Sequence, residues 1–70
     1  MKFGFIVFAS MSDLTRFLEA NPELALGGKL YRSNTRPFVQ YDEMNEEEET
    51  EVLRQALRFG GVYHDTNNSH

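Results

Sequence analysis

The first segment of the chain, residues 2–9 (KFGFIVFA), is apolar on both of its faces. It is rich in aromatic and β-branched residues, which favour a β-strand. Successive side chains of a strand point to opposite faces. The two resulting sets are Phe3, Phe5 and Val7 on one face and Gly4, Ile6 and Phe8 on the other. A strand with two apolar faces needs cover on both, and in a chain of 70 residues this is the main constraint on the fold.

Two helices are predicted from capping patterns and helical spacing. Ser10 begins a Ser-x-x-Asp pattern, and Pro22 closes the segment, which gives a first helix over residues 11–20. Asn45, with Glu48 three residues later, predicts the start of a second helix, and Gly60 ends it. The expected buried positions are Leu14, Phe17 and Leu18 in the first helix and Val52, Leu53, Ala56 and Leu57 in the second.

Three further strands are predicted between and after the helices. Residues 29–33 and 37–42 read as a hairpin joined by Asn34-Thr35-Arg36, after a turn at Gly27-Gly28. Residues 61–65 read as a last short strand, and residues 66–70 as a disordered polar tail to a single domain over residues 1–65.

The order β-α-β-β-α-β predicts an α+β fold of the small split βαβ, or ferredoxin-like, type, with two helices on one face of the sheet. Without the last strand the sheet would have three strands. Helices on one face leave the other face uncovered, so we expect a homodimer that covers Phe3, Phe5 and Val7.

Composition narrows the classes of function. The chain has no cysteine, which excludes disulfides and cysteine-based zinc or redox sites. No stretch has the roughly 20 apolar residues of a membrane span, and the start of the chain lacks a convincing signal-peptide pattern, so we expect a soluble, cytoplasmic protein. His64-Asp65 has no nucleophile motif beside it. We therefore expect no enzyme activity, no cofactor and no metal site.

The acidic residues are concentrated in one segment. The net charge is −4, and seven of the ten residues 42–51 are acidic while none is basic. Carboxylates at a helix start complement the helix dipole, but seven exceed that need, because neighbouring like charges repel. The expected partner-binding residues are Asp42, Glu43, Glu46, Glu47, Glu48, Glu49 and Glu51.

In size, charge clustering and lack of catalytic groups, the chain resembles the small acidic DNA-mimic inhibitors made by bacteriophages. That resemblance implies a non-enzymatic inhibitor whose carboxylates take the place of DNA phosphates, spaced at about one charge per 1.7 Å, in the groove of a basic DNA- or RNA-binding protein. Direct binding of nucleic acid by this chain is not expected, since gripping phosphates takes clustered Lys and Arg.

A second resemblance leads to an alternative. The run from Lys2 to Phe8 is similar to the aromatic signature of RNA-recognition motifs, K/R-G-F/Y-G/A-F-V-x-F/Y, and the likeness extends over about residues 2–33. It implies a module that stacks single-stranded bases on Phe3 and Phe5. Phosphates would then lie near the basic residues Lys2, Lys29, Arg32 or Arg36. The sequence allows two roles for the basic hairpin, which contains Lys29, Arg32 and Arg36: it contacts a partner, or it only balances the charge of the acidic helix.

Overall fold

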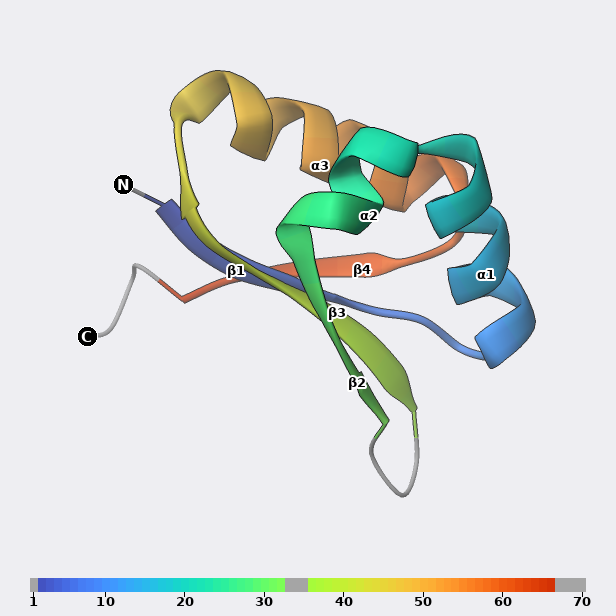
Figure 1. Cartoon of the computed structure of the whole chain (residues 1–70). Helices are drawn as coiled ribbons and strands as arrows, with labels where there is room; N and C mark the ends of the chain where they lie inside the picture. The colour runs from blue at the N-terminus through green and yellow to red at the C-terminus, as the bar shows by residue number, and fades with distance from the viewer. Residues whose placement is uncertain (1, 33–35, 67–70) are drawn as a thin grey trace.

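A computed structural model describes residues 2–32 and 36–66. These residues form a four-stranded sheet with three helices on one face (Figure 1). The elements are β1 (Lys2–Val7), α1 (Met11–Ala20), α2 (Pro22–Gly27), β2 (Gly28–Arg32), β3 (Pro37–Met44), α3 (Glu46–Arg58) and β4 (Val62–Asp65). The predicted small α+β fold is confirmed.

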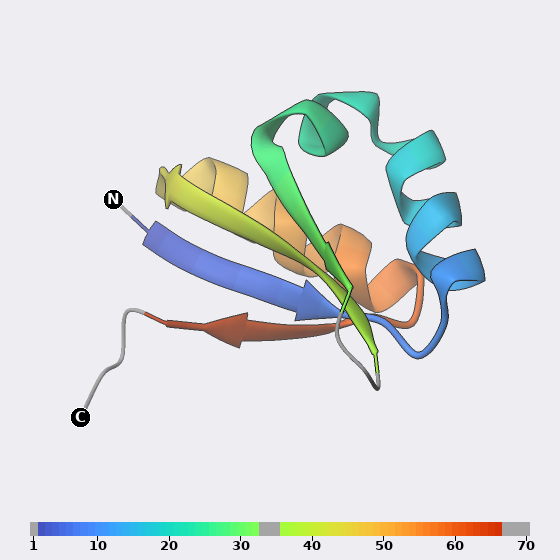
Figure 2. The ribbon, with the colours of Figure 1, turned by 60° about the horizontal axis from the view of Figure 1, so that its bottom comes forward.

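The strands lie in the order β2-β3-β1-β4, and every neighbouring pair is antiparallel (Figure 2). Strand β3 thus separates β1 from β2, and β1 separates β3 from β4. This is the strand arrangement expected of a split βαβ sheet. The predicted last strand is present as β4, and it pairs with β1 along its whole length.

The helices begin where the sequence predicts. The side chain of Ser10 accepts a hydrogen bond from the backbone N–H of Asp13 at 3.2 Å. At the start of α3, the Glu48 N–H donates to Asn45 Oδ1 at 2.8 Å, and the Asn45 N–H donates to Glu48 Oε1 at 3.0 Å. The predicted capping box of Asn45 and Glu48 is therefore formed in full.

Helix α2 was not predicted from the sequence. Pro22 ends the first helical segment as expected, but it also occupies the first turn of a new helix, where its missing N–H costs nothing. The expected turn at Gly27-Gly28 is instead a direct junction, since α2 ends at Gly27 and β2 begins at Gly28. Within residues 2–32 and 36–66, three helices rather than two therefore lie on one face of the sheet.

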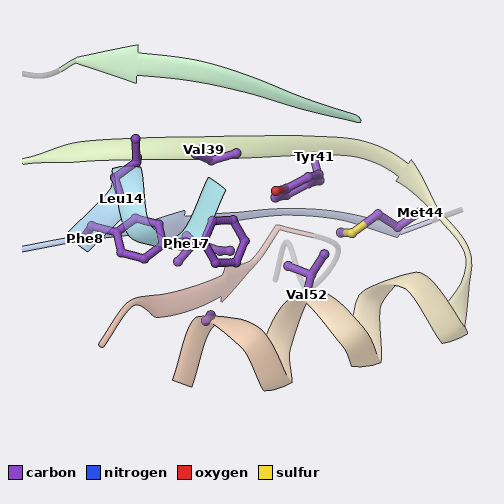
Figure 3. Close-up of a cluster of buried hydrophobic side chains, with 9 residues drawn as sticks. Phe8, Leu14, Phe17, Val39, Tyr41, Met44 and Val52 are labelled. Carbon is purple, nitrogen blue, oxygen red and sulfur yellow. The ribbon is translucent and has the colours of Figure 1, made fainter. Parts of the chain in front are cut away.

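The core lies between the sheet and the helices (Figure 3). Ile6 and Phe8 face the helices, as the alternation predicts, while Phe5 and Val7 are only half-buried on the opposite face. The buried hydrophobic side chains of the core are Ile6, Phe8, Leu14, Phe17, Val39, Tyr41, Met44, Val52 and Ala56. The sheet face without helices is called the open face below.

One expectation about the core was wrong. Val52 and Ala56 of α3 are buried, but Leu53 is 42% exposed and Leu57 is 71% exposed. Leu53 and Leu57 each follow a buried residue and are therefore rotated about 100° from it around the helix axis. Helix α3 therefore buries a narrow stripe that contains Val52 and Ala56 and leaves these two leucines at its flank.

Strand β3 contains an irregularity where it pairs with β1. Lys2 lies opposite Met44 and Gly4 opposite Tyr41, so β3 carries one extra residue at this point. Glu43 within it has a φ of 57°, in the left-handed region. This bulge keeps both Tyr41 and Met44 buried although they are three residues apart, and it carries β3 two residues past its predicted end at Asp42.

The two chain segments predicted to be loop or tail are only partly described. Asn34 and Thr35 of the expected hairpin loop lie outside the described residues, as do residues 67–70 of the expected tail. Thr66 lies within them. Its backbone N–H and its hydroxyl both donate to the carbonyl oxygen of Phe3, each at 3.0 Å.

Candidate functional site

The acidic segment, residues 42–51, begins in β3 and continues through the first turns of α3. Its seven carboxylates do not form one uniform row. Four of them have partners within the protein: Asp42, Glu48, Glu49 and Glu51. The structure therefore divides the segment into acids that hold the fold together and acids that are left to solvent.

Glu48 and Glu49 serve the helix that carries them. Glu48 closes the capping box at the start of α3. Glu49 accepts a hydrogen bond from the hydroxyl of Tyr63 on β4, with 2.9 Å between Tyr63 Oη and Glu49 Oε2. Glu48 therefore stabilises the start of α3, and Glu49 connects α3 to β4.

Asp42 and Glu51 each have polar partners at the surface of the protein. Gln40 Nε2 donates to Asp42 Oδ1 at 3.1 Å, and Lys29 Nζ lies 3.4 Å from Asp42 Oδ2. The hydrogen bond from Gln40, followed by the Lys29 ammonium, lowers the pKa of Asp42. The basic hairpin thus balances at least one residue of the acidic segment directly.

Glu51 forms a similar exposed pair on α3. It accepts hydrogen bonds from Gln55, at 3.0 Å, and from Arg54. These two bonds, with that from Gln55 the larger effect, lower the pKa of Glu51. Such pairs add little to stability, but they occupy the carboxylate.

The side chains of Glu43, Glu46 and Glu47 are different. All three are exposed, and none makes a hydrogen bond or ion pair with another described residue. Glu46 and Glu47 border a shallow surface depression on α3 together with Thr50. Within the segment, these three carboxylates are the ones available to a partner.

Charge is also divided between the two layers of the molecule. The helices carry eight acidic and three basic side chains. The strands and the connections between them carry four basic and three acidic side chains. Because all three helices lie on the same side of the sheet (Figure 1), the helix layer is strongly acidic and the sheet layer is close to neutral.

The open face of the sheet carries a row of rings that crosses all four strands. Tyr31 of β2 stacks on Phe38 of β3, with ring centroids 5.0 Å apart. Phe38 meets Phe5 of β1 edge to face at 5.6 Å, and Phe5 stacks on His64 of β4 at 4.9 Å. These four residues are called the aromatic row.

The face of β1 that was predicted to carry Phe3, Phe5 and Val7 is therefore part of the open face. Val7 lies opposite Phe38 on one side and opposite Val62 on the other, so it adds apolar surface beside the aromatic row. Sequence reasoning named Phe38 or Tyr41 as a neighbour on the uncovered face, but it did not place Tyr31 and His64 there. The signal that unites them is the pairing register of the strands, which a single sequence does not reveal.

His64, the residue weighed for catalysis, belongs to the aromatic row through its stacking on Phe5. Across residues 2–32 and 36–66, no group of three or more His, Cys, Asp or Glu side chains is arranged to hold a metal ion. Within the same residues, no helix is long and apolar enough to cross a membrane.

A buried hydroxyl lies between the sheet and α2. Tyr41 is 3% exposed, and its hydroxyl has no hydrogen-bond partner among the described residues. Burial raises the pKa of Tyr41. The residue borders a recess of about 110 Å³ that is lined by Leu24 and Val52 and also by the acidic residues Glu23, Asp42, Glu43 and Glu48.

Comparisons of the chain with protein-family models, with curated proteins and with solved structures found no match. The molecule offers two surfaces to a partner: the acidic helix layer and the aromatic open face.

Proposed function

We propose that this protein is a non-enzymatic binding protein that uses its acidic surface to engage a basic DNA- or RNA-binding protein and to compete with nucleic acid for it. The observation that carries the proposal is that Glu43, Glu46 and Glu47 of the acidic segment are exposed and make no hydrogen bond or ion pair with another described residue. Glu46 and Glu47 begin α3, Glu43 lies near the end of β3, and the helix layer as a whole carries eight carboxylates against three guanidinium groups.

Physical reasons support a partner that is basic. A surface of one charge sign steers an oppositely charged partner and speeds its encounter. Carboxylates held on a helix and on a bulged strand keep their spacing, so they can replace phosphates in a groove that reads the nucleic-acid backbone. The attraction between exposed charges falls with salt, because the Debye length is only about 8 Å at physiological ionic strength.

The homodimer expected from the sequence is part of this proposal. Two copies would present two acidic helix layers, and a partner with a long basic groove could contact both. The resulting avidity would exceed that of one copy without any new kind of contact.

The experiment is capture of proteins from a cell lysate on the immobilised full chain, followed by elution with duplex DNA. We expect the retained proteins to be basic, to bind nucleic acid and to be released by the DNA. The variant Glu46→Gln/Glu47→Gln should retain much less, because it removes two available carboxylates and leaves the capping box and the Tyr63 contact in place.

The matched control is Glu19→Gln/Glu23→Gln. It removes the same charge from exposed positions of α1 and α2, outside the acidic segment. Retention by this control with loss by the Glu46/Glu47 variant assigns binding to the segment. Equal retention by both variants, or retained proteins without affinity for nucleic acid, would refute the proposal.

The alternative function, single-strand binding through the strand that contains Phe5, would use the open face. The sheet architecture and the aromatic row favour it. Against it, the central rings Phe5 and Phe38 each have ring neighbours on both sides, and base stacking needs a free ring face. We therefore place it second.

A further inference from the structure

The open face of the sheet is an apolar surface that no helix among residues 2–32 and 36–66 covers (Figure 1). We propose that a second copy of this chain binds there, so that two molecules pack sheet against sheet through their aromatic rows. This inference rests on the proposed function only for the existence of a homodimer, and it does not depend on the basic partner.

The exposed apolar residues of this face are the first support. Val62 is 55% exposed and Tyr31 is 41% exposed, and they lie on the two edge strands, β4 and β2. Between them, Phe5 and Phe38 are half-buried and hold the row together. Apolar surface that spans a whole sheet marks an interaction site when it is contiguous.

The distribution of charge selects a second copy and its orientation. The helix layer, with eight acidic and three basic side chains, repels the same layer of another molecule. The open face carries charges of both signs, since Lys29 and Asp42 form an ion pair there beside Gln40, which lies opposite Phe5. Two open faces can therefore approach without net repulsion, and an interface is favoured when like charges are kept apart.

The size of the face sets the expected strength of the contact. Four strands spaced about 4.8 Å apart, with five residues at about 3.3 Å each, give a face of roughly 19 by 17 Å. Stable interfaces bury about 800 Å² on each partner. The flat projection is only about 320 Å², and although protruding rings raise the accessible area, the face remains smaller than a standard interface, so the contact should be weak. The dimer should thus dissociate in the micromolar range.

Ring packing favours a protein over a nucleic acid on this face. The stacked pairs Tyr31–Phe38 and Phe5–His64 use ring faces inside the row. Rings that are stacked side by side across neighbouring strands present mainly their edges to the outside. Edges suit the interdigitated packing of two sheets, which lie about 10 Å apart when they pack face to face.

The test is sedimentation of the full chain over a series of concentrations from low micromolar upward. We expect the mass to rise from that of one chain, 8.1 kDa, towards twice that value. Val62→Glu and Tyr31→Glu should each raise the dissociation constant at least about tenfold, equivalent to 1.4 kcal/mol. Leu57→Glu is the matched control, because it makes the same change at an exposed position of the helix layer.

A second measurement does not depend on any variant. Backbone amide chemical shifts of the wild-type chain should change with concentration at β1, β2, β3 and β4 and stay constant in α1 and α3. Circular dichroism tests whether each variant is folded. If a variant is unfolded, the chemical shifts of the wild-type chain decide instead.

Three outcomes would overturn the inference. The first is a mass of one chain at every concentration. The second is loss of the dimer in Leu57→Glu but not in Val62→Glu. The third is a monomer that binds single-stranded oligouridylate and loses it in Tyr31→Glu, which would assign the face to nucleic acid. If monomeric Val62→Glu still retains the basic proteins of the lysate, the basic-partner proposal stands by itself.

Discussion

The hydroxyl of Tyr63 on β4 donates a hydrogen bond to the carboxylate of Glu49 on α3, with 2.9 Å between Tyr63 Oη and Glu49 Oε2. It joins residues 14 positions apart in the chain and connects an edge strand to the helix that carries most of the acidic segment. One of the acids singled out for binding is therefore engaged in the fold.

Replacement of Tyr63 by Phe tests this contact. Loss of a hydrogen bond to a charged group costs about 1.5–3 kcal/mol when buried, and the half-buried position of Tyr63 reduces that figure. We expect the free energy of unfolding to fall by about 1 kcal/mol, measured by urea denaturation. Glu49→Gln should cost less than Tyr63→Phe, because the amide oxygen can still accept the bond; a larger loss would contradict this assignment.

Gly4 makes room for the same tyrosine. A Cβ added at Gly4 would overlap the hydroxyl end of the Tyr63 ring. We expect Gly4→Ala to destabilise the protein by about 1–3 kcal/mol, the usual cost of overpacking. In a Tyr63→Ala background the same substitution should cost much less, because the two residues are coupled. Equal costs in the two backgrounds, measured by urea denaturation, would show that the ring is not the obstacle.

Alkaline pH should destabilise the protein through its tyrosines. Burial raises the pKa of Tyr41, and burial with the Glu49 contact raises that of Tyr63. The folded protein therefore keeps these protons where the unfolded chain releases them. Stability is complete below pH about 10 and is lost as pH rises further, by up to about 1.4 kcal/mol per pH unit for each tyrosine.

Urea denaturation at several pH values above and below that point measures the effect. The double variant Tyr41→Phe/Tyr63→Phe should show a flatter dependence on pH, because it removes both tyrosines whose pKa is raised by burial. An identical slope in wild type and double variant would assign the alkaline loss to other groups.

Tyr41 also allows a prediction at neutral pH. A buried hydroxyl without a partner costs about 1–3 kcal/mol, so Tyr41→Phe should keep the stability of the protein or raise it by about 1 kcal/mol. Thermal and urea denaturation measure the change. A clear loss of stability would show that the hydroxyl has a hydrogen-bond partner in its recess.

The effect on stability should differ between the capping box of α3 and the available carboxylates of Glu46 and Glu47. Asn45→Ala should lower the free energy of unfolding by about 1 kcal/mol, because it removes the side-chain acceptor for the Glu48 N–H. Glu46→Gln/Glu47→Gln should change it by only about 0.5 kcal/mol or less, since the lost interaction with the helix dipole is offset by relief of repulsion between neighbouring carboxylates. Urea denaturation of both variants gives the comparison, and equal losses would contradict the division of the segment.

Local patterns in the sequence predicted much of the fold. The alternation in β1, the capping residues of α1 and α3 and the order of the elements depend on neighbours within a few positions, and these were confirmed. Helix α2 was missed because proline is compatible with two positions. Pro22 ends one helix and is also favoured in the first turn of the next.

The acidic segment shows where such patterns stop. The sequence determines its charge, because charge depends only on composition. Only the tertiary structure decides that Glu49 meets Tyr63 and Asp42 meets Lys29 while Glu46 and Glu47 stay exposed, because these contacts join elements that are distant in the chain.

The same division holds for the apolar residues. The sequence by itself determined that β1 has two apolar faces, since side chains in a strand alternate. The tertiary structure alone decided that the helices cover the face of Ile6 and that Phe5 joins Tyr31, Phe38 and His64 in one row. The physical reason is strand register: it is set by pairing between distant segments, and it brings four separate residues onto one surface.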